Sequence, residues 1–243
     1  RSTLRMERNV LIDPEEGHIA RWVKKMGGTV IEIDSFKEPM MNLFEIEVEE
    51  DPETGPRIDI LGKVSEIRAI LGLVVEKSSG QKLTAEERVA IEESVRELYS
   101  VRGINSNPNS LYTDESDDSI RVSKKKKELP TISDFKALLE TKPGTERLSL
   151  LITPMLRGNT LGMFDGQSKL DLKDELLICF DIHNIRDEFT RLYVMSVLLS
   201  WIWQKYTVKN PKVKKHVYFD EGWMFAKHED TAEYLETLAR RAR

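Results

Sequence analysis

Two adjacent carboxylates, Asp220 and Glu221, are the residues of this chain whose types and spacing best fit catalysis. They follow His216-Val217-Tyr218-Phe219, a run suited to a buried β-strand. Open α/β sheets bind their ligands at the carboxyl ends of the strands. In a nucleotide hydrolase the first acid can hold the Mg²⁺ shell, directly or through water, and the second can orient the attacking water. An acidic loop that merely follows a strand would have the same sequence, so both interpretations remain open.

A second acidic cluster, Asp13-Pro14-Glu15-Glu16, follows the short apolar run Asn9 to Ile12. If this strand end lies beside the same crevice, Asp13 and Glu15 are candidates for contacts with a bound nucleotide. The alternative is a solvated turn in which Glu15 and Glu16 favour the N-terminus of the next helix.

Each of two basic clusters also has both a functional and a purely structural interpretation. The C-terminal arginines, Arg240 and Arg243 among them, could reach the phosphates of a neighbouring subunit, as arginine fingers do. They could equally form an ordinary cationic end of a helix. The run Lys124 to Lys127 could contact nucleic acid or lie in a solvated loop.

The sequence contains no phosphate-binding loop of the form Gly-x-x-x-x-Gly-Lys-Ser/Thr, because Gly62-Lys63 is followed by Val64. In nucleotide hydrolases that have this loop, its backbone amides and its lysine cradle the β- and γ-phosphates of the nucleotide. We therefore expect the chain as given to bind ATP poorly on its own.

The elements that would position these residues follow an α/β rhythm at both ends of the chain. Residues 9–13 and 29–33 are predicted strands around a helix over 19–26, which Gly27-Gly28 would end. The rhythm returns with a strand over 176–181, a helix over 188–206, the strand over 216–219 and a helix over 231–243. The predicted fold class is therefore α/β with a mainly parallel sheet.

The middle of the chain is predicted to be mostly helical. Apolar residues recur at helical spacing over 60–75, and Thr84 with Glu87 forms a capping box that begins a second helix. Residues 105–130 collect turn-forming and charged residues, which predicts a mobile surface loop. A third helix is predicted from Ser133 to Thr141.

Composition and net charge argue against some classes of protein. The 243 residues can form one large domain or a core with an inserted subdomain, and the net charge of −5 argues against a generally basic protein that coats nucleic acid. Cys179, a lone cysteine in an apolar run, cannot form an internal disulfide and fits a reducing compartment. The apolar stretch Leu192 to Trp203 is shorter than the roughly 20 residues that span a bilayer. No direct membrane span is expected.

The order of motifs resembles that of conjugative-transfer ATPases of type IV secretion, the large TraC-like proteins related to DNA-pumping hexamers. The first motif is Leu11-Ile12-Asp13-Pro14-Glu15-Glu16-Gly17-His18, where family members tend to have Asp-Pro-Glu-Gly-Glu-Tyr. The other motifs follow in the family's order over nearly the whole chain: Met26-Gly27-Gly28, Met41 to Phe44, Leu129 to Phe135, Gly162 to Gly166, Leu170 to Leu172, Phe180 to Ile182, Tyr218 to Trp223 and Leu238 to Arg243.

The resemblance implies a RecA-like P-loop NTPase core with a mostly helical insert, hydrolysis of ATP with Mg²⁺, and assembly into a hexamer. It makes Asp220 the Walker B acid, which holds Mg²⁺ through water, and Glu221 the residue that activates water. Arg240 and Arg243 fall in a region that reaches an active site in relatives. The implied partners are other copies of the chain, membrane components of the secretion or conjugation channel, a coupling protein and DNA. The implied location is the cytoplasm, at the inner face of the cell membrane.

On this basis we expect residues 1–58 to form the first part of the ATPase core, 59–160 the insert, and 161–243 the second part with the Walker B strand. Family members have a phosphate loop before these segments and a further strand after them, and we expect both to be omitted from the sequence given. Two alternatives remain open: a DNA translocase of the coupling-protein kind, and a catalytically inactive assembly scaffold if the phosphate loop is truly absent.

Overall fold

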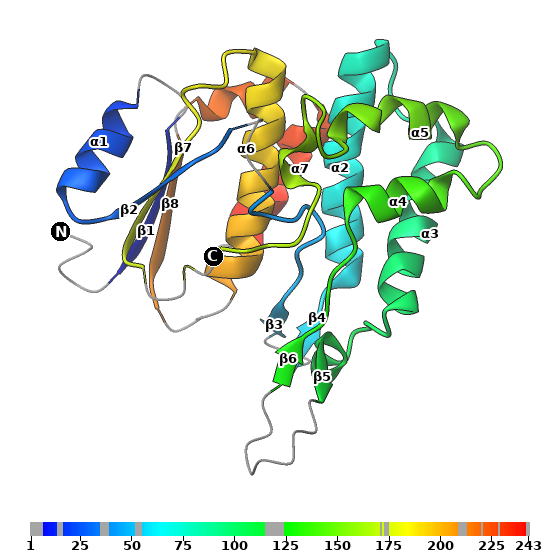
Figure 1. Ribbon diagram of the computed structural model, residues 1–243, viewed down its shortest axis with the longest axis horizontal. Helices are drawn as coiled ribbons and strands as arrows, with labels where there is room; N and C mark the ends of the chain where they lie inside the picture. Colours follow the sequence, from blue (N-terminus) through cyan, green and yellow to red (C-terminus); the bar gives the residue numbers. More distant parts are fainter. Residues whose placement is uncertain are drawn as a thin grey trace.

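The computed structural model describes residues 7–13, 17–34, 39–51, 55–114, 124–170, 172, 175–208, 213–219, 221–227 and 229–241. Its centre is a four-stranded parallel sheet in the order β2-β7-β1-β8. The strands are β1 (Arg8–Asp13), β2 (Thr29–Glu32), β7 (Leu177–Asp181) and β8 (Lys215–Phe219). The sheet is covered by helix α1 (His18–Lys25) on one face and by α6 (Glu188–Ile202) on the other, and α7 (Glu229–Arg241) packs beside α2 (Ile60–Ser79) (Figure 1).

Strand β7 has the character of a central strand. It pairs with β2 on one side and with β1 on the other, and all five of its residues are buried. A strand that is buried on both faces reads as a continuous apolar run, as Leu177 to Phe180 does. The prediction of a buried parallel strand here is confirmed.

Strand β8 differs from its prediction. We expected His216 to Phe219 to be buried, but Val217 is 37% exposed and Tyr218 is 50% exposed. Within the described part of the chain β8 pairs with β1 alone. Its apolar side chains therefore reach solvent at the edge of the sheet.

Helix α1 ends at two glycines, as predicted, and each is needed for a different reason. Gly27 has a φ of 77°, a left-handed conformation that favours glycine. At Gly28 an added Cβ would lie 2.8 Å from the carbonyl oxygen of Leu177 and 2.7 Å from Cγ1 of Val23. Gly28 therefore allows the end of the helix to pack closely on β7.

The helical region comprises α2 (Ile60–Ser79), α3 (Ala85–Val101), α4 (Ile132–Leu139) and α5 (Glu146–Leu151). The capping box of α3 is confirmed: Thr84 accepts from the N–H of Glu87, whose side chain accepts from the N–H of Thr84. These helices share one continuous apolar core with the sheet and α6. The domain boundaries near residues 58 and 160 stay a prediction.

Two antiparallel hairpins lie near each other at one end of the molecule, at the bottom of Figure 1. One joins β3 (Val48–Asp51) to β4 (Gly55–Ile58), and the other joins β5 (Tyr112–Asp114) to β6 (Lys124–Lys126). The sequence predicted a surface loop over 105–130, but the described part of this segment contains the β5–β6 hairpin and a 3₁₀ helix, Pro108–Leu111. Residues 115–123 lie outside the described part.

Short irregular helices complete the fold. The 3₁₀ turns Thr153–Met155 and Gly162–Phe164 precede β7, and η6 (Gly222–Lys227) leads into α7. Helix α6 continues into a π-helical turn, η5 (Trp203–Thr207). None of the described helices combines the length and the apolar character that a membrane crossing requires.

Candidate active site

Acidic residues collect at the carboxyl edge of the sheet. In the strand register Asp13 of β1 lies opposite Asp181 of β7, and Asp181 lies opposite Glu32 of β2. Phe219, the last residue of β8, lies opposite Ile12, so Glu221 follows at the same edge. Parallel strands bring these side chains together because all their carboxyl ends point the same way. The structure thus places two predicted site residues, Asp13 and Glu221, on one edge.

Asp13 is held by the helix that follows it. Its residue surface is 2% exposed, and the backbone N–H of Ala20 donates to its Oδ2 at 3.1 Å. Ala20 lies in the first turn of α1, where N–H groups have no partner within the helix. The carboxylate therefore stabilises the start of α1. Its contact with a nucleotide stays a prediction, and Glu15 lies outside the described residues.

Asp181 forms a pair with His183 that the sequence analysis missed. The imidazole Nδ1 lies 2.5 Å from Oδ1 of Asp181, and the backbone N–H of His183 donates to the same oxygen at 3.2 Å. The carboxylate is 7% exposed and the imidazole 36% exposed. Asp-x-His directly after an apolar strand is a local signal that could have revealed this pair.

The pair opens onto a surface cleft of about 740 Å³. Arg21 and Lys24 of α1 line one side of the cleft, and Met40 and Leu170 contribute apolar surface. A buried carboxylate in contact with one ring nitrogen fixes the orientation of the imidazole.

Glu221 has an unusual backbone. Its φ is 59°, and among the described residues it is the one non-glycine residue with a positive φ. This left-handed conformation costs a residue with a side chain roughly 1–2 kcal/mol. The next element is held tightly, because the N–H of Met224 donates to the carbonyl of Glu221 at 2.9 Å and a Cβ on Gly222 would lie 2.6 Å from Phe219. Asp220 lies outside the described residues.

Arg240 lies on the exposed side of α7. It donates to Glu236 Oε1 at 2.6 Å, and the two side chains are 77% and 60% exposed. The opposite side of α7 packs on the core through Tyr234 and Leu238, which are 6% and 8% exposed. Arg240 therefore lies on an exposed face of α7, its role at an active site stays a prediction, and Arg243 lies outside the described residues.

Cys179 lies inside the sheet, behind the acidic edge. Burial, together with the nearby charges of Asp13 and Asp181, raises the pKa of its thiol to about 12. A thiol with so high a pKa is protonated and unreactive at neutral pH. Cys179 therefore has a packing role, as its apolar neighbours predicted.

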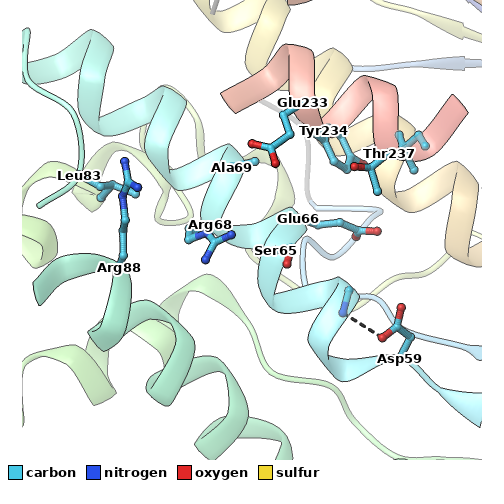
Figure 2. Close-up of a pocket in the computed structure, with 12 residues that line it drawn as sticks. Asp59, Ser65, Glu66, Arg68, Ala69, Leu83, Arg88, Glu233, Tyr234 and Thr237 are labelled. Carbon is cyan, nitrogen blue, oxygen red and sulfur yellow. Dashed lines mark hydrogen bonds between the residues drawn. The ribbon is translucent and has the colours of Figure 1, made fainter. Parts of the chain in front are cut away.

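A separate cavity of about 400 Å³ lies between α2, α3 and α7 (Figure 2). Its walls carry both charges, with Arg68 and Arg88 from α2 and α3 and Glu233 from α7. The predicted residues Asp13, Glu221 and Arg240 are not among those that line it.

The parallel sheet, the helices on its faces and the helical region over α2 to α5 define an α/β fold with a mainly parallel sheet, which is the fold class predicted from the sequence. A solved structure with this fold is that of VirB4 of Thermoanaerobacter pseudethanolicus, with a TM-score of 0.68 and 20% sequence identity. The likeness covers 97% of this chain and 87% of that chain. No protein-family model matches the sequence, and no curated protein matches it.

Proposed function

We propose that this chain is the motor portion of a type IV secretion ATPase, which hydrolyses ATP with Mg²⁺ to drive substrate transfer or the assembly of a secretion channel or pilus. VirB4 is a type IV secretion ATPase, and its fold extends over 97% of this chain. The motifs of the sequence occur in the order found in conjugative-transfer ATPases. The fold and the motif order support the same class independently.

The observation that carries the proposal is the left-handed backbone of Glu221 at the carboxyl end of β8. Strained residues persist where the surrounding structure holds them, and they cluster at active sites. A glutamate that served only as a solvated loop residue would gain nothing from this conformation, because a glycine would fit better. The strained position therefore favours a role for this particular carboxylate.

In this proposal Glu221 orients and polarises the attacking water. Asp220 holds the Mg²⁺ shell through water, which suits a cation that prefers oxygen ligands and keeps several of its own waters. Bound Mg²⁺ would neutralise charge that develops on the phosphates. Asp13 and Glu15 would contact the nucleotide at the neighbouring strand end, and Arg240 or Arg243 would act on the site of an adjacent subunit.

The proposed assembly, location and partners follow from the resemblance to type IV secretion ATPases. We propose that the protein assembles with copies of itself as a hexamer and docks on membrane components of the channel at the inner face of the cell membrane. Its partners would include a coupling protein and DNA. Of the lysine run, Lys126 and Lys127 are engaged within the chain, with Glu45 and with the carbonyl of Arg102 respectively. This observation weighs against the run as a DNA-binding patch.

The test uses the full-length natural protein that contains this chain. We expect Glu221→Gln to bind ATP with unchanged affinity but to hydrolyse it on the order of 10²-fold more slowly, since the amide cannot accept a proton from water. The matched control is Glu233→Gln on α7, which should leave turnover unchanged. Equal turnover in Glu221→Gln and wild type would remove the catalytic role. Undetectable ATP binding by the wild-type protein would favour the inactive scaffold.

A further inference from the structure

Three glutamates alternate along the segment that forms and precedes β3: Glu45, Glu47 and Glu49. Residues two apart in an extended chain point to the same side. Glu45 and Glu47 are 2% and 3% exposed. Carboxylates are rarely this buried unless cations or hydrogen-bond donors meet them.

Two lysines from distant parts of the chain meet these carboxylates. Lys126 of β6 places its Nζ 2.5 Å from Glu45 Oε1 and 2.8 Å from Glu47 Oε1, and it also donates to the carbonyl of Ile46 at 2.7 Å. An ammonium has three protons, so these contacts use all of them. Lys205 of η5 lies 2.9 Å from Glu45 Oε1 and 3.0 Å from Glu47 Oε1. We call Glu45, Glu47, Lys126 and Lys205 together the hairpin cluster.

The hairpin cluster joins the β5–β6 hairpin to the π-helical turn η5. Other contacts strengthen the same junction: Trp203 Nε1 donates to Glu49 at 3.2 Å, and the N–H of Glu47 donates to the side-chain oxygen of Gln204 at 3.0 Å. A π-helical turn is rare and often marks a functional site, and η5 is such a turn at the C-terminal end of α6. In this protein η5 directs the side chains of Trp203, Gln204 and Lys205 toward the extended segment over 45–49.

The same turn is fixed from its other side by the sheet. Lys215, the first residue of β8, donates to the carbonyl of Thr207 at 2.8 Å. The guanidinium of Arg8 in β1 lies over the ring of Tyr206, 5.7 Å from its centroid. A continuous set of contacts therefore runs from the hairpin through η5 to β8, the strand that leads to Glu221.

We propose that the hairpin cluster is a mechanical coupling between the β5–β6 hairpin and β8. When a force on the hairpin displaces Lys126, the contacts that hold η5 weaken. The backbone of β8, which η5 contacts, then becomes less ordered. The consequence for catalysis at residues 220–221 rests on the function proposed above, whereas the coupling itself does not.

Hydrogen exchange measured by mass spectrometry on the full-length natural protein that contains this chain, without nucleotide, tests the coupling. We expect Lys126→Met to speed amide exchange in η5 and β8 as well as in the hairpin, on the order of tenfold, because opening of coupled segments costs less free energy once a shared contact is lost. The matched control is Lys125→Met, since Lys125 is the exposed neighbour of Lys126. This control should leave η5 and β8 at the wild-type rate. Helix α3 serves as the internal reference.

Faster exchange confined to the hairpin, with η5 and β8 unchanged, would overturn the coupling. If Lys126→Met fails to fold, the double variant Glu47→Gln/Lys126→Met decides, because it removes one charge of each sign and leaves the Glu45–Lys205 pair. A negative result here would leave the ATPase proposal intact. Loss of the ATPase proposal through Glu221→Gln would leave the coupling result intact.

Discussion

Asp13 and Asp181 lie opposite each other on neighbouring parallel strands, and their residue surfaces are 2% and 6% exposed. Each carboxylate has a local partner, which is the N–H of Ala20 for Asp13 and the imidazole of His183 for Asp181. The acids on β1 and β7 thus organise the edge of the sheet. Glu221 differs from both because it is only partly buried and its backbone is strained.

Cys179 should be inert toward thiol reagents in the folded protein. Its side chain is fully buried, and burial with the charges of Asp13 and Asp181 raises its pKa to about 12. Only the thiolate reacts, so at about pH 8 the reactive fraction is negligible. We expect labelling by a chromogenic disulfide to reach one thiol per chain only after urea is added. Labelling of the native protein at the rate of the unfolded chain would contradict the buried position.

Two substitutions of Asp13 can separate its structural role at the start of α1 from its proposed contact with the nucleotide. Asp13→Ala removes the acceptor for the N–H of Ala20 and should lower the free energy of unfolding by about 1 kcal/mol, as the loss of a helix cap does. Asp13→Asn keeps an acceptor oxygen and should cost less. Urea denaturation of both variants measures the structural effect.

The nucleotide role of Asp13 is then read in the full-length protein. If Asp13→Asn is as stable as wild type but binds ATP more weakly, the residue also contacts the nucleotide. Unchanged affinity would restrict Asp13 to the start of α1.

Glu221→Gly should make the protein more stable while it abolishes hydrolysis. At a φ of 59° glycine avoids the steric cost of a Cβ, so we expect the free energy of unfolding to rise by about 1 kcal/mol. Glu221→Gln keeps the Cβ and should leave stability unchanged, which makes it the matched control. Thermal or urea unfolding of the three proteins measures the difference. A glycine variant less stable than wild type would show that the left-handed backbone carries no strain.

Local sequence signals predicted the central strand and the helix caps. The continuous apolar run of β7 and the capping box of Thr84 and Glu87 each depend on a few neighbouring residues. The exposure of β8 could not be predicted in this way, because it depends on which strands lie beside it. The same holds for the candidate site: the sequence identified the carboxylate of Glu221, but its left-handed backbone is imposed by the turn around it.

The hairpin cluster was missed for a related reason. Glu45 meets Lys126, which is 81 residues away, and Glu47 meets Lys205, which is 158 residues away. Read alone, alternating glutamates before a short strand predict a solvated face. Only the folded chain shows that two lysines reach them. Contacts of this kind carry no local signal, whereas Asp181 and His183 are two residues apart and could have been recognised.

The stability that Glu45 contributes should be lost in acid. Burial alone would raise the pKa of this carboxyl, but Lys126 and Lys205 outweigh burial and hold its pKa below the ordinary value of 4.5. A carboxyl whose pKa is lower in the folded state stabilises the protein above its unfolded pKa and loses that contribution as the pH falls through the folded value. The contribution should thus be constant from about pH 7 down to about pH 5 and decline below pH 4.5.

Urea unfolding of wild type and Glu45→Gln at several pH values measures this effect, because the carboxyl groups outside the hairpin cluster titrate alike in both proteins. Near neutral pH the variant should be less stable by about 3 kcal/mol, since Lys126 and Lys205 would then share the single charge of Glu47. Below pH 4.5 the two proteins should converge, as wild type also loses the charge at position 45. A stability difference that stays constant through the acid range would show that packing, and not charge, holds the cluster together.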